Sequence, residues 1–173
     1  MVRDPVIRRA RPEDADAICG TFDAAARAGW AHFLPADRLH EIALPHHAVV
    51  DWLDRAATHR LLVADVDGAV AGFTLARPSE DHDAAPDVGE VHMLYVRPDA
   101  WRGGLGRALL EAAQDALRDA GHPEATLWTG SENHRPRALY AAAGWRLDGA
   151  ERRFDYLGVE LVNLRYRRPL APG

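Results

Sequence analysis

The chain has little cysteine, no long apolar run and no excess of positive charge. Its single cysteine, Cys19, rules out an internal disulfide and fits the reducing cytosol. No apolar stretch approaches the roughly 18 residues that a membrane-spanning helix needs, and Met1–Pro5 lacks the apolar core of a signal peptide. The formal net charge of −5 argues against nucleic acid as a partner, because phosphate-backbone binding needs a basic surface. We therefore expect a cytoplasmic protein that binds neither membrane nor nucleic acid.

The length of 173 residues predicts one domain, 1–173, with a single large core. Apolar spacing predicts helices over Glu13–Gly29, His46–His59, Arg107–Ala120 and Pro136–Ala143. It predicts strands over Val6–Arg9, Leu61–Asp65, Ala69–Ala76, Val88–Val96, Ala125–Thr129, Trp145–Leu147 and Val159–Arg167. The mixed order indicates an α/β (α+β) fold. Cys19 falls in the first helix, where an alanine-rich pattern favours a small buried side chain over a nucleophile.

A glycine-rich stretch, Trp101 to Arg107, joins an expected strand to an expected helix. Gly103, Gly104 and Gly106 let the backbone adopt positive φ and approach a ligand closely. The helix start behind them presents unpaired N–H groups and the positive end of the helix dipole. This arrangement predicts a pyrophosphate cradle, while a tight turn without a ligand explains the glycines alone about equally well.

Two familiar glycine motifs do not fit this stretch. A Walker loop needs Lys and then Ser or Thr after its last glycine, but Arg107 and Ala108 stand there. A dinucleotide fingerprint needs a third small residue where the chain has Leu109.

The surroundings of the loop add a family resemblance. The segment from Val91 to Leu110 resembles the acetyl-CoA signature of the GNAT superfamily of N-acetyltransferases, with Gly104 and Gly106 on its two glycine positions. The segment from Asn133 to Trp145 looks like the family's second motif, in which Asn opens a short helix that carries Tyr and ends at Gly plus an aromatic residue. The resemblance covers about Leu61 to Trp145. It implies a GNAT-like twisted mixed central β-sheet flanked by helices.

The resemblance also implies how acetyl-CoA is held. The end of the strand would pair its backbone with the pantetheine arm, the loop N–H groups would take the pyrophosphate, and Asn133 would bond the pantetheine. The alternative for Asn133 is a helix cap. Trp101 stands where the family has Gln or Arg, so Arg102 or Arg107 would supply the charge. The residues expected at the cofactor are Leu94, Tyr95, Val96, Trp101, Arg102, Gly103, Gly104, Leu105, Gly106, Arg107, Asn133, Arg135 and Tyr140.

Acetyl transfer to an amine needs a proton acceptor, and the strand before the loop offers two. Because side chains alternate along a strand, we expect Glu90, His92, Leu94 and Val96 to share one face. Partial burial would raise the pKa of Glu90 toward neutrality, and His92 begins near it. Glu90 is the first candidate and His92 the second, directly or through a water. A solvated strand-end Glu and a core histidine form the alternative.

The departing thiolate needs a proton, and the resemblance implies that Tyr140 supplies it. The alternative is an amphipathic core tyrosine. A backbone N–H near Leu94 would polarise the thioester carbonyl.

The acceptor site is expected near Trp30, Phe33 and Glu90. The acidic loop between Pro78 and Pro86 is interpreted either as a rim that attracts a cationic amine or as a solvated charge run. No metal is expected, because no histidine pair has ligand spacing with a third donor.

These features predict transfer of an acetyl group from acetyl-CoA, as cosubstrate, to a primary amine by direct attack in a ternary complex. A small-molecule acceptor is favoured because nothing resembles a peptide groove. The alternatives are a protein or peptide acceptor and a non-catalytic acyl-CoA-binding regulatory domain. The exposed closing strands offer an edge for a homodimer.

Overall fold

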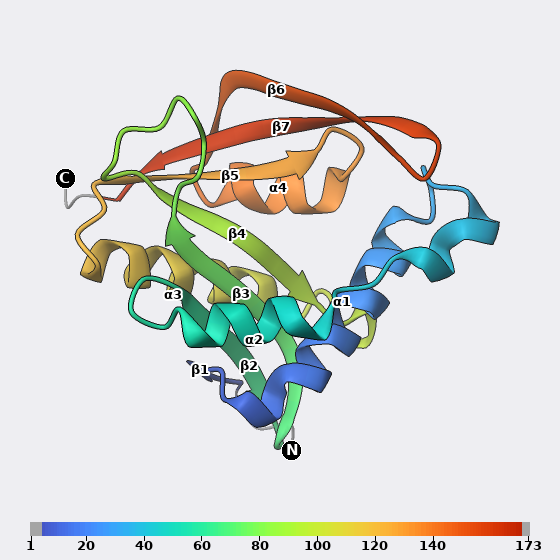
Figure 1. The fold of residues 1–173 in the computed structure, drawn as a ribbon, viewed down its shortest axis with the longest axis horizontal. Helices are drawn as coiled ribbons and strands as arrows, with labels where there is room; N and C mark the ends of the chain where they lie inside the picture. The colour runs from blue at the N-terminus through green and yellow to red at the C-terminus, as the bar shows by residue number, and fades with distance from the viewer. Residues whose placement is uncertain (1–4, 171–173) are drawn as a thin grey trace.

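A single mixed sheet organises the computed structural model, which describes residues 5–170. Among these residues seven strands lie in the order β1-β2-β3-β4-β5-β7-β6 (Figure 1). Neighbours are antiparallel except for β4 and β5, which are parallel. The strands are β1 (Val6–Arg9), β2 (Arg60–Val66), β3 (Ala69–Pro78), β4 (Gly89–Val96), β5 (Glu124–Gly130), β6 (Arg146–Tyr156) and β7 (Val159–Pro169).

Helices cover both faces of this sheet. They are α1 (Ala15–Trp30), α2 (His46–Asp54), α3 (Leu105–Asp119) and α4 (His134–Ala142), with short 3-10 turns at Pro12–Asp14, Ala36–Glu41 and Pro98–Ala100. α1 and α2 pack on one face of β2 and β3, while α3 and α4 pack on the other side against β4, β5 and β7 (Figure 1). The expected sheet flanked by helices is confirmed.

The apolar helix faces that the sequence predicts pack against the sheet in these layers. Leu109, Leu110 and Leu117 of α3 are fully or almost fully buried, as helical spacing requires of one apolar face. Cys19 is half-buried and packs against the core under α1, and burial raises the pKa of its thiol. Both observations support its structural interpretation.

Two boundaries differ from the prediction. α2 ends at Asp54 instead of reaching His59, because residues 55–58 form turns closed by N–H donation from Thr58 and His59 to the Arg55 carbonyl. The strand expected over Trp145–Leu147 is the start of the eleven-residue β6. Most of β6 is exposed on both faces, and its clear apolar alternation is limited to Phe154 and Tyr156 at its end, so its pairing with β7 defines it.

β4 and β5 stay together over a very short distance. They pair only at Gly89 with Ala125 and Glu90 with Thr126, and then diverge (Figure 1). Beyond Glu90, no strand among residues 5–170 pairs with the β5-facing edge of β4. The divergence opens the sheet at its centre.

β4 also contains a β-bulge at His92. Leu75 of β3 pairs with Met93 and the next residue, Ala76, pairs with Val91, so one extra residue of β4 lies between them. A bulge reverses the alternation of side chains on either side of it. The bulge therefore decides which β4 side chains face α1 and α2, and which face α3.

No helix within residues 5–170 combines the length and apolar character needed to cross a bilayer. Residues 1–4, which make up most of the segment that lacks a signal-peptide core, lie outside the described residues. Residues 171–173 also lie outside them.

Candidate active site

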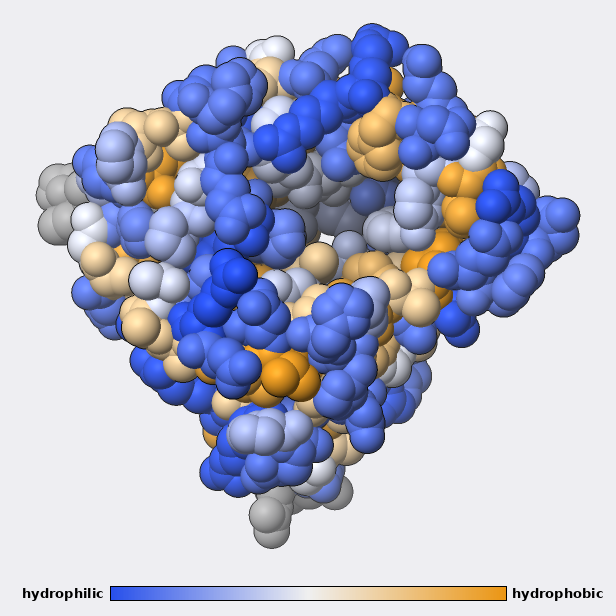
Figure 2. All heavy atoms as spheres, in the orientation of Figure 1, coloured by the Kyte–Doolittle hydropathy of each residue, from blue (hydrophilic) through white to orange (hydrophobic). Residues whose placement is uncertain are grey.

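The divergence of β4 and β5 opens a cleft of about 1330 Å³ through the middle of the molecule. Figure 2 shows it as a hollow near the centre of the face turned to the viewer. Every residue predicted for the site lines this cleft except Gly103. We call the part formed by Leu94–Arg107 and Asn133–Tyr140 the glycine-loop half. We call the part formed by α1, Arg77–Asp81, Glu90, His92 and Arg152–Tyr156 the hairpin half.

The loop before α3 has the geometry of an anion cradle. Gly104 is the N-cap of α3, in the left-handed region at φ 81°, and no described side chain caps the helix there. The first N–H groups of a helix have no intrahelical acceptor, and the ladder begins with Ala108 donating to the Gly104 carbonyl. A Cβ at Gly106 would lie 3.4 Å from Leu139 Cδ2, so glycine allows close packing of α3 against α4. These residues fit a pyrophosphate group.

A guanidinium from α4, on the other side of the cleft, contacts the Trp101 ring. Arg135, in the first turn of α4, lies over the Trp101 ring at 4.2 Å from its centroid. The Trp101 indole Nε1 donates to the Val96 carbonyl at 2.7 Å. Of the two arginines expected to supply charge, Arg107 pairs with Glu111 at 2.9 Å and Arg102 is exposed.

Asn133 stands at the N-cap position of α4, but its side chain makes no capping hydrogen bond. Its Nδ2 donates instead to Thr129 Oγ1 at 3.4 Å, and the residue lines the cleft. The helix-cap alternative therefore does not account for this side chain.

The predicted face of β4 is wrong because of the bulge. Val91 packs in the α3-side core, and Leu94 and Val96 pack on the same side. Glu90 and His92 instead lie on the opposite face, toward α2, where the His92 ring stands edge-on to Trp52 at 6.3 Å. Regular alternation would have kept all four predicted residues together. The bulge keeps Glu90 with His92 and separates both from Leu94 and Val96.

Arg77, at the end of β3, joins the titratable side chains of the hairpin half. Its Nε donates to Glu90 Oε2 at 3.0 Å, its Nη1 lies 2.9 Å from Glu80 Oε1, and its Nη2 lies 3.1 Å from His92 Nδ1. Because a guanidinium only donates, His92 Nδ1 accepts this bond and a neutral ring carries its proton on Nε2. Glu90 Oε1 lies 3.6 Å from the same Nδ1, which places it to receive an N–H when the ring is protonated.

The pKa of Glu90 moves opposite to the expected direction. Burial raises it, but the contacts with His92 and with the Arg77 guanidinium lower it more, so the pKa lies below its ordinary value. The expectation of a raised pKa is therefore wrong. Glu90 is an ionised, buried carboxylate rather than a solvated strand end.

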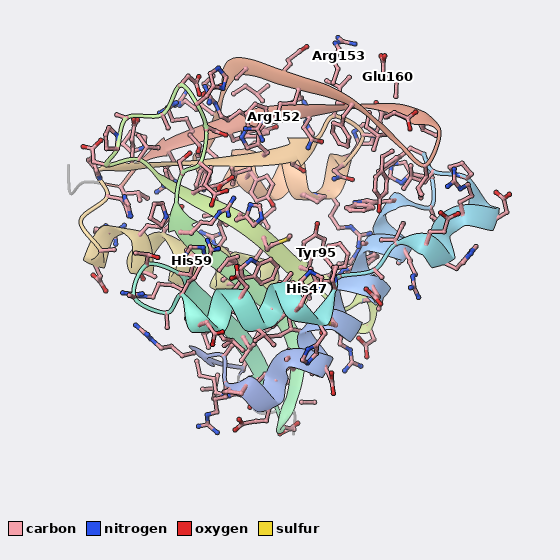
Figure 3. The ribbon with its side chains drawn as sticks, viewed as in Figure 1. His47, His59, Tyr95, Arg152, Arg153 and Glu160 are labelled. Carbon is pink, nitrogen blue, oxygen red and sulfur yellow. The ribbon has the colours of Figure 1, made fainter. Side chains whose placement is uncertain are left out.

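Two phenols from opposite faces of the opened sheet line the cleft. Tyr140 of α4 is buried and lines the cleft, and burial raises its pKa with a smaller contribution from Tyr166. Burial also raises the pKa of Tyr95, and the nearby hydroxyls of Tyr140 and Tyr156 add to it. Tyr95 lies between α1 and the upper strands in Figure 3. Both phenols keep their protons at neutral pH and present O–H donors inside the cleft.

Arginines bind two carboxylates of the acidic loop, so the loop is not an unpaired acidic rim. Asp81 is buried, accepts from the Trp128 indole at 3.1 Å, and pairs with Arg152 and with Arg165 at 3.1 Å. Asp83 pairs with Arg165 through two bonds of 2.7 and 2.8 Å, which hold the pKa of Asp83 at about 2. These carboxylates attach the loop to β5, β6 and β7, while Glu80 and Asp83 remain exposed to solvent.

Sequence reasoning missed the contribution of β6. Arg152, Phe154 and Tyr156 alternate along the strand and line the cleft. Figure 3 shows Arg152 beneath the hairpin that β6 and β7 form, and Arg153 pointing outward from it. The period-two spacing of Phe154 and Tyr156 was the available signal, and the charges around it concealed the strand. No sequence pattern marked Arg77, because its role depends on partners far along the chain.

Within residues 5–170, no group of three or more His, Cys, Asp or Glu side chains is arranged to hold a metal ion.

Comparison with known proteins gives the family. Residues 27–145 match the model of the acetyltransferase (GNAT) family. A mycothiol acetyltransferase of Pseudarthrobacter chlorophenolicus is 33% identical over 139 residues, covering 79% of this chain and 41% of that protein. A mycothiol acetyltransferase of Clavibacter sepedonicus is 40% identical over 119 residues, covering 68% and 32%. The chain thus spans about two fifths or less of the length of these relatives.

Solved structures show the same fold. The Salmonella typhimurium protein yncA, solved with acetyl-CoA, superposes with a TM-score of 0.79 at 20% identity, covering 99% of this chain and 96% of that one. PaiA N-acetyltransferase of Thermoplasma acidophilum, solved with coenzyme A, gives 0.78 at 16% identity, covering 96% and 99%. With the family model and the sequence relatives, these findings show that the chain belongs to the GNAT acetyltransferase family.

Proposed function

We propose that the protein is an N-acetyltransferase that moves an acetyl group from acetyl-CoA to the primary amine of a small molecule. One observation carries this proposal. The β4–β5 cleft joins an uncapped helix start behind a glycine loop to the pair of buried Glu90 and half-buried His92. A phosphate-bearing donor and a group that loses a proton can therefore meet in one space. We take 1–173 as one cytoplasmic domain.

The glycine-loop half is assigned to acetyl-CoA. The N–H groups of Leu105, Gly106 and Arg107 would bind the pyrophosphate, and Arg135 stacked on Trp101 would add positive charge from α4. The unpaired edge of β4 near Leu94 would bond the pantetheine arm, with Asn133 on its other side. Acetyl-CoA supplies the activated thioester.

The reaction proceeds by direct attack in a ternary complex. The amine nitrogen bonds to the acetyl carbon and the carbon–sulfur bond breaks. The nitrogen gives its proton to Glu90, directly or through a water. His92 is the second candidate acceptor, and its Nδ1 would take the proton in place of the hydrogen bond from Arg77. Arg77 holds both side chains. A backbone N–H near Leu94 polarises the carbonyl.

Tyr140 is assigned to the departing sulfur. A phenol near pKa 10 does not readily protonate a thiolate near 8.5, and burial raises the pKa of Tyr140 further. A thiolate buried beside Tyr140 would have its own pKa raised, which narrows this gap. Tyr140 therefore first donates a hydrogen bond to the sulfur and then transfers the proton.

The small-molecule acceptor agrees loosely with the relatives' name, mycothiol acetyltransferase. A protein acceptor and a regulatory domain without turnover are the competing functions. The pair of buried Glu90 and half-buried His92 favours an enzyme over a sensor, because binding alone does not use a proton acceptor.

The test is release of free thiol from acetyl-CoA across a panel of amines, amino acids and short peptides. The 173 residues contain no lysine, so no lysine of the protein itself competes as an acceptor. Turnover with a small amine is expected. Turnover with peptides alone would establish a protein acceptor, and acetyl-CoA binding without turnover on any acceptor would support the regulatory domain.

A further inference from the structure

The hairpin half of the cleft is lined largely by aromatic side chains. They are Phe22 and Trp30 of α1 with Phe154 and Tyr156 of β6, and this half is bordered by Phe33, just after α1, and by Tyr95 of β4. Trp30 stands edge-on to Phe22 at 6.1 Å and to Tyr156 at 6.2 Å, so the end of α1 and the end of β6 form one aromatic corner. Edge-on rings leave flat faces and edges available for a further ring.

Two features leave room in this corner. Phe154 is 39% exposed, which is unusual for so large an apolar side chain, and it faces the cleft. Across from the hairpin, Gly29 of α1 lines the same space, and a Cβ at Gly29 would meet no atom within 4 Å. The walls therefore stand apart, and apolar surface on both sides is available to a ligand.

The charges nearby are already paired. Glu80 and Glu90 bind Arg77, and Asp81 binds Arg152 and Arg165. Binding of a polycation would require these carboxylates to leave arginines that they contact within a partly dry site. The chamber thus offers apolar contact but little uncompensated negative charge.

We infer that the acceptor is a primary amine carrying an aromatic ring, or an apolar group of similar size, seated between α1 and β6 with its nitrogen directed toward Glu90 and His92. This inference rests on the proposed function and specifies its substrate class. Polyamines and aminoglycosides fall outside that class. The step is the acetyl transfer described above, with the amine proton passing to the Glu90–His92 pair.

The first experiment compares amines that differ only in the ring. Thiol release is measured with phenylethylamine, ethylamine and spermidine at saturating acetyl-CoA. Burial of a phenyl group is expected to raise kcat/KM for phenylethylamine at least about 30-fold over ethylamine. Equal values for the two, or spermidine as the best substrate, would overturn the inference while leaving the transferase itself intact.

A matched pair of glycines in α1 tests whether the acceptor binds in the aromatic corner. Gly20 and Gly29 both have open space at the Cβ position, but only Gly29 lines the cleft. Gly29→Leu is expected to lower kcat/KM for phenylethylamine at least about 10-fold with unchanged acetyl-CoA affinity. Gly20→Leu is expected to change neither. Equal behaviour of the two variants would overturn the assignment of the aromatic corner.

A binding measurement separates failure of this inference from failure of the proposed function. If no amine releases thiol, phenylethylamine is titrated calorimetrically into the protein saturated with acetyl-CoA. Binding that weakens in Gly29→Leu and not in Gly20→Leu would support the aromatic site and reject the transferase. Absence of binding would reject the inference as well.

Discussion

The two halves of the cleft are built in different ways. The glycine-loop half comes from two local segments, each of which carries its ligand-facing groups within a few residues of one turn. The hairpin half is assembled from α1, the end of β3, the bulge of β4 and the distant strand β6. A local half depends on backbone geometry, whereas an assembled half depends on ion pairs and packing between remote elements. The substitutions below are chosen to separate these two dependences.

The largest effect is expected where the hairpin half is held together. Arg165 is buried and binds Asp81, Asp83 and Asp148, so Arg165→Met leaves the buried Asp81 with fewer partners. We expect a loss of about 3–5 kcal/mol in the free energy of unfolding, measured by urea denaturation. Arg153→Met on the same hairpin removes only exposed ion pairs and should change it by less than about 0.5 kcal/mol. Similar losses in both would show that the network does not hold the loop.

Glu90→Gln tests the chemistry of the hairpin half. The amide retains a hydrogen-bond acceptor for Arg77 but cannot take a proton, so kcat should fall about 100-fold or more with unchanged acetyl-CoA affinity. Glu151→Gln, an exposed change on β6, is the control. Full activity of Glu90→Gln would transfer the proton-acceptor role to His92 or to a water.

Tyr140→Phe tests the proton donor assigned to the departing sulfur. Turnover should fall about 10- to 100-fold, because the sulfur loses its hydrogen-bond donor, while acetyl-CoA affinity changes little. Tyr166→Phe is the matched control, since Tyr166 packs against Tyr140 at 5.9 Å but does not line the cleft. Unchanged turnover in Tyr140→Phe would leave Tyr140 as a core tyrosine.

Gly104→Ala tests the backbone dependence of the glycine-loop half. Alanine at φ 81° costs about 1–2 kcal/mol, and the shifted loop should weaken acetyl-CoA binding about 10-fold in a calorimetric titration. Gly121 lies after α3 at φ 91°, and Gly121→Ala carries the same strain outside the cleft. It should destabilise the fold similarly without changing the affinity. Weaker acetyl-CoA binding in both variants would show that backbone strain anywhere in the fold, and not the geometry of the glycine loop, lowers the affinity.

The smallest effect concerns acid. The pKa values of Asp14, Asp83 and Glu90 lie below their ordinary values, so these groups stabilise the fold above about pH 4 and lose that contribution as the pH falls through their lowered pKa values. The melting temperature should stay level between about pH 7 and 5 and decline toward pH 2. Arg165→Met should flatten the part of this decline that Asp83 contributes. An equally steep decline of the melting temperature in the variant would show that Asp83 does not contribute to the decline.

The sequence predicted the local half well because the information lies in short segments. Gly104 and Gly106 mark a turn that only glycine accommodates easily, and apolar spacing marks α3 behind it. Asn133 and Tyr140 follow at helical spacing on α4. The assembled half was predicted less well. The bulge at His92 depends on the register with β3. The lowered pKa of Glu90 depends first on His92, which this bulge places beside it, and then on Arg77, which stands 13 positions earlier in the chain.

The amino-acid sequence by itself determined the order of elements, the glycine-loop turn and the family, because helix periodicity and turn residues act over neighbouring positions. Only the tertiary structure decided that β4 and β5 diverge after one short pairing and that the acidic loop is neutralised by arginines of β6 and β7. It also decided that Phe154 and Tyr156 face the end of α1. These features depend on strand register and on contacts between residues tens of positions apart, which no local pattern specifies.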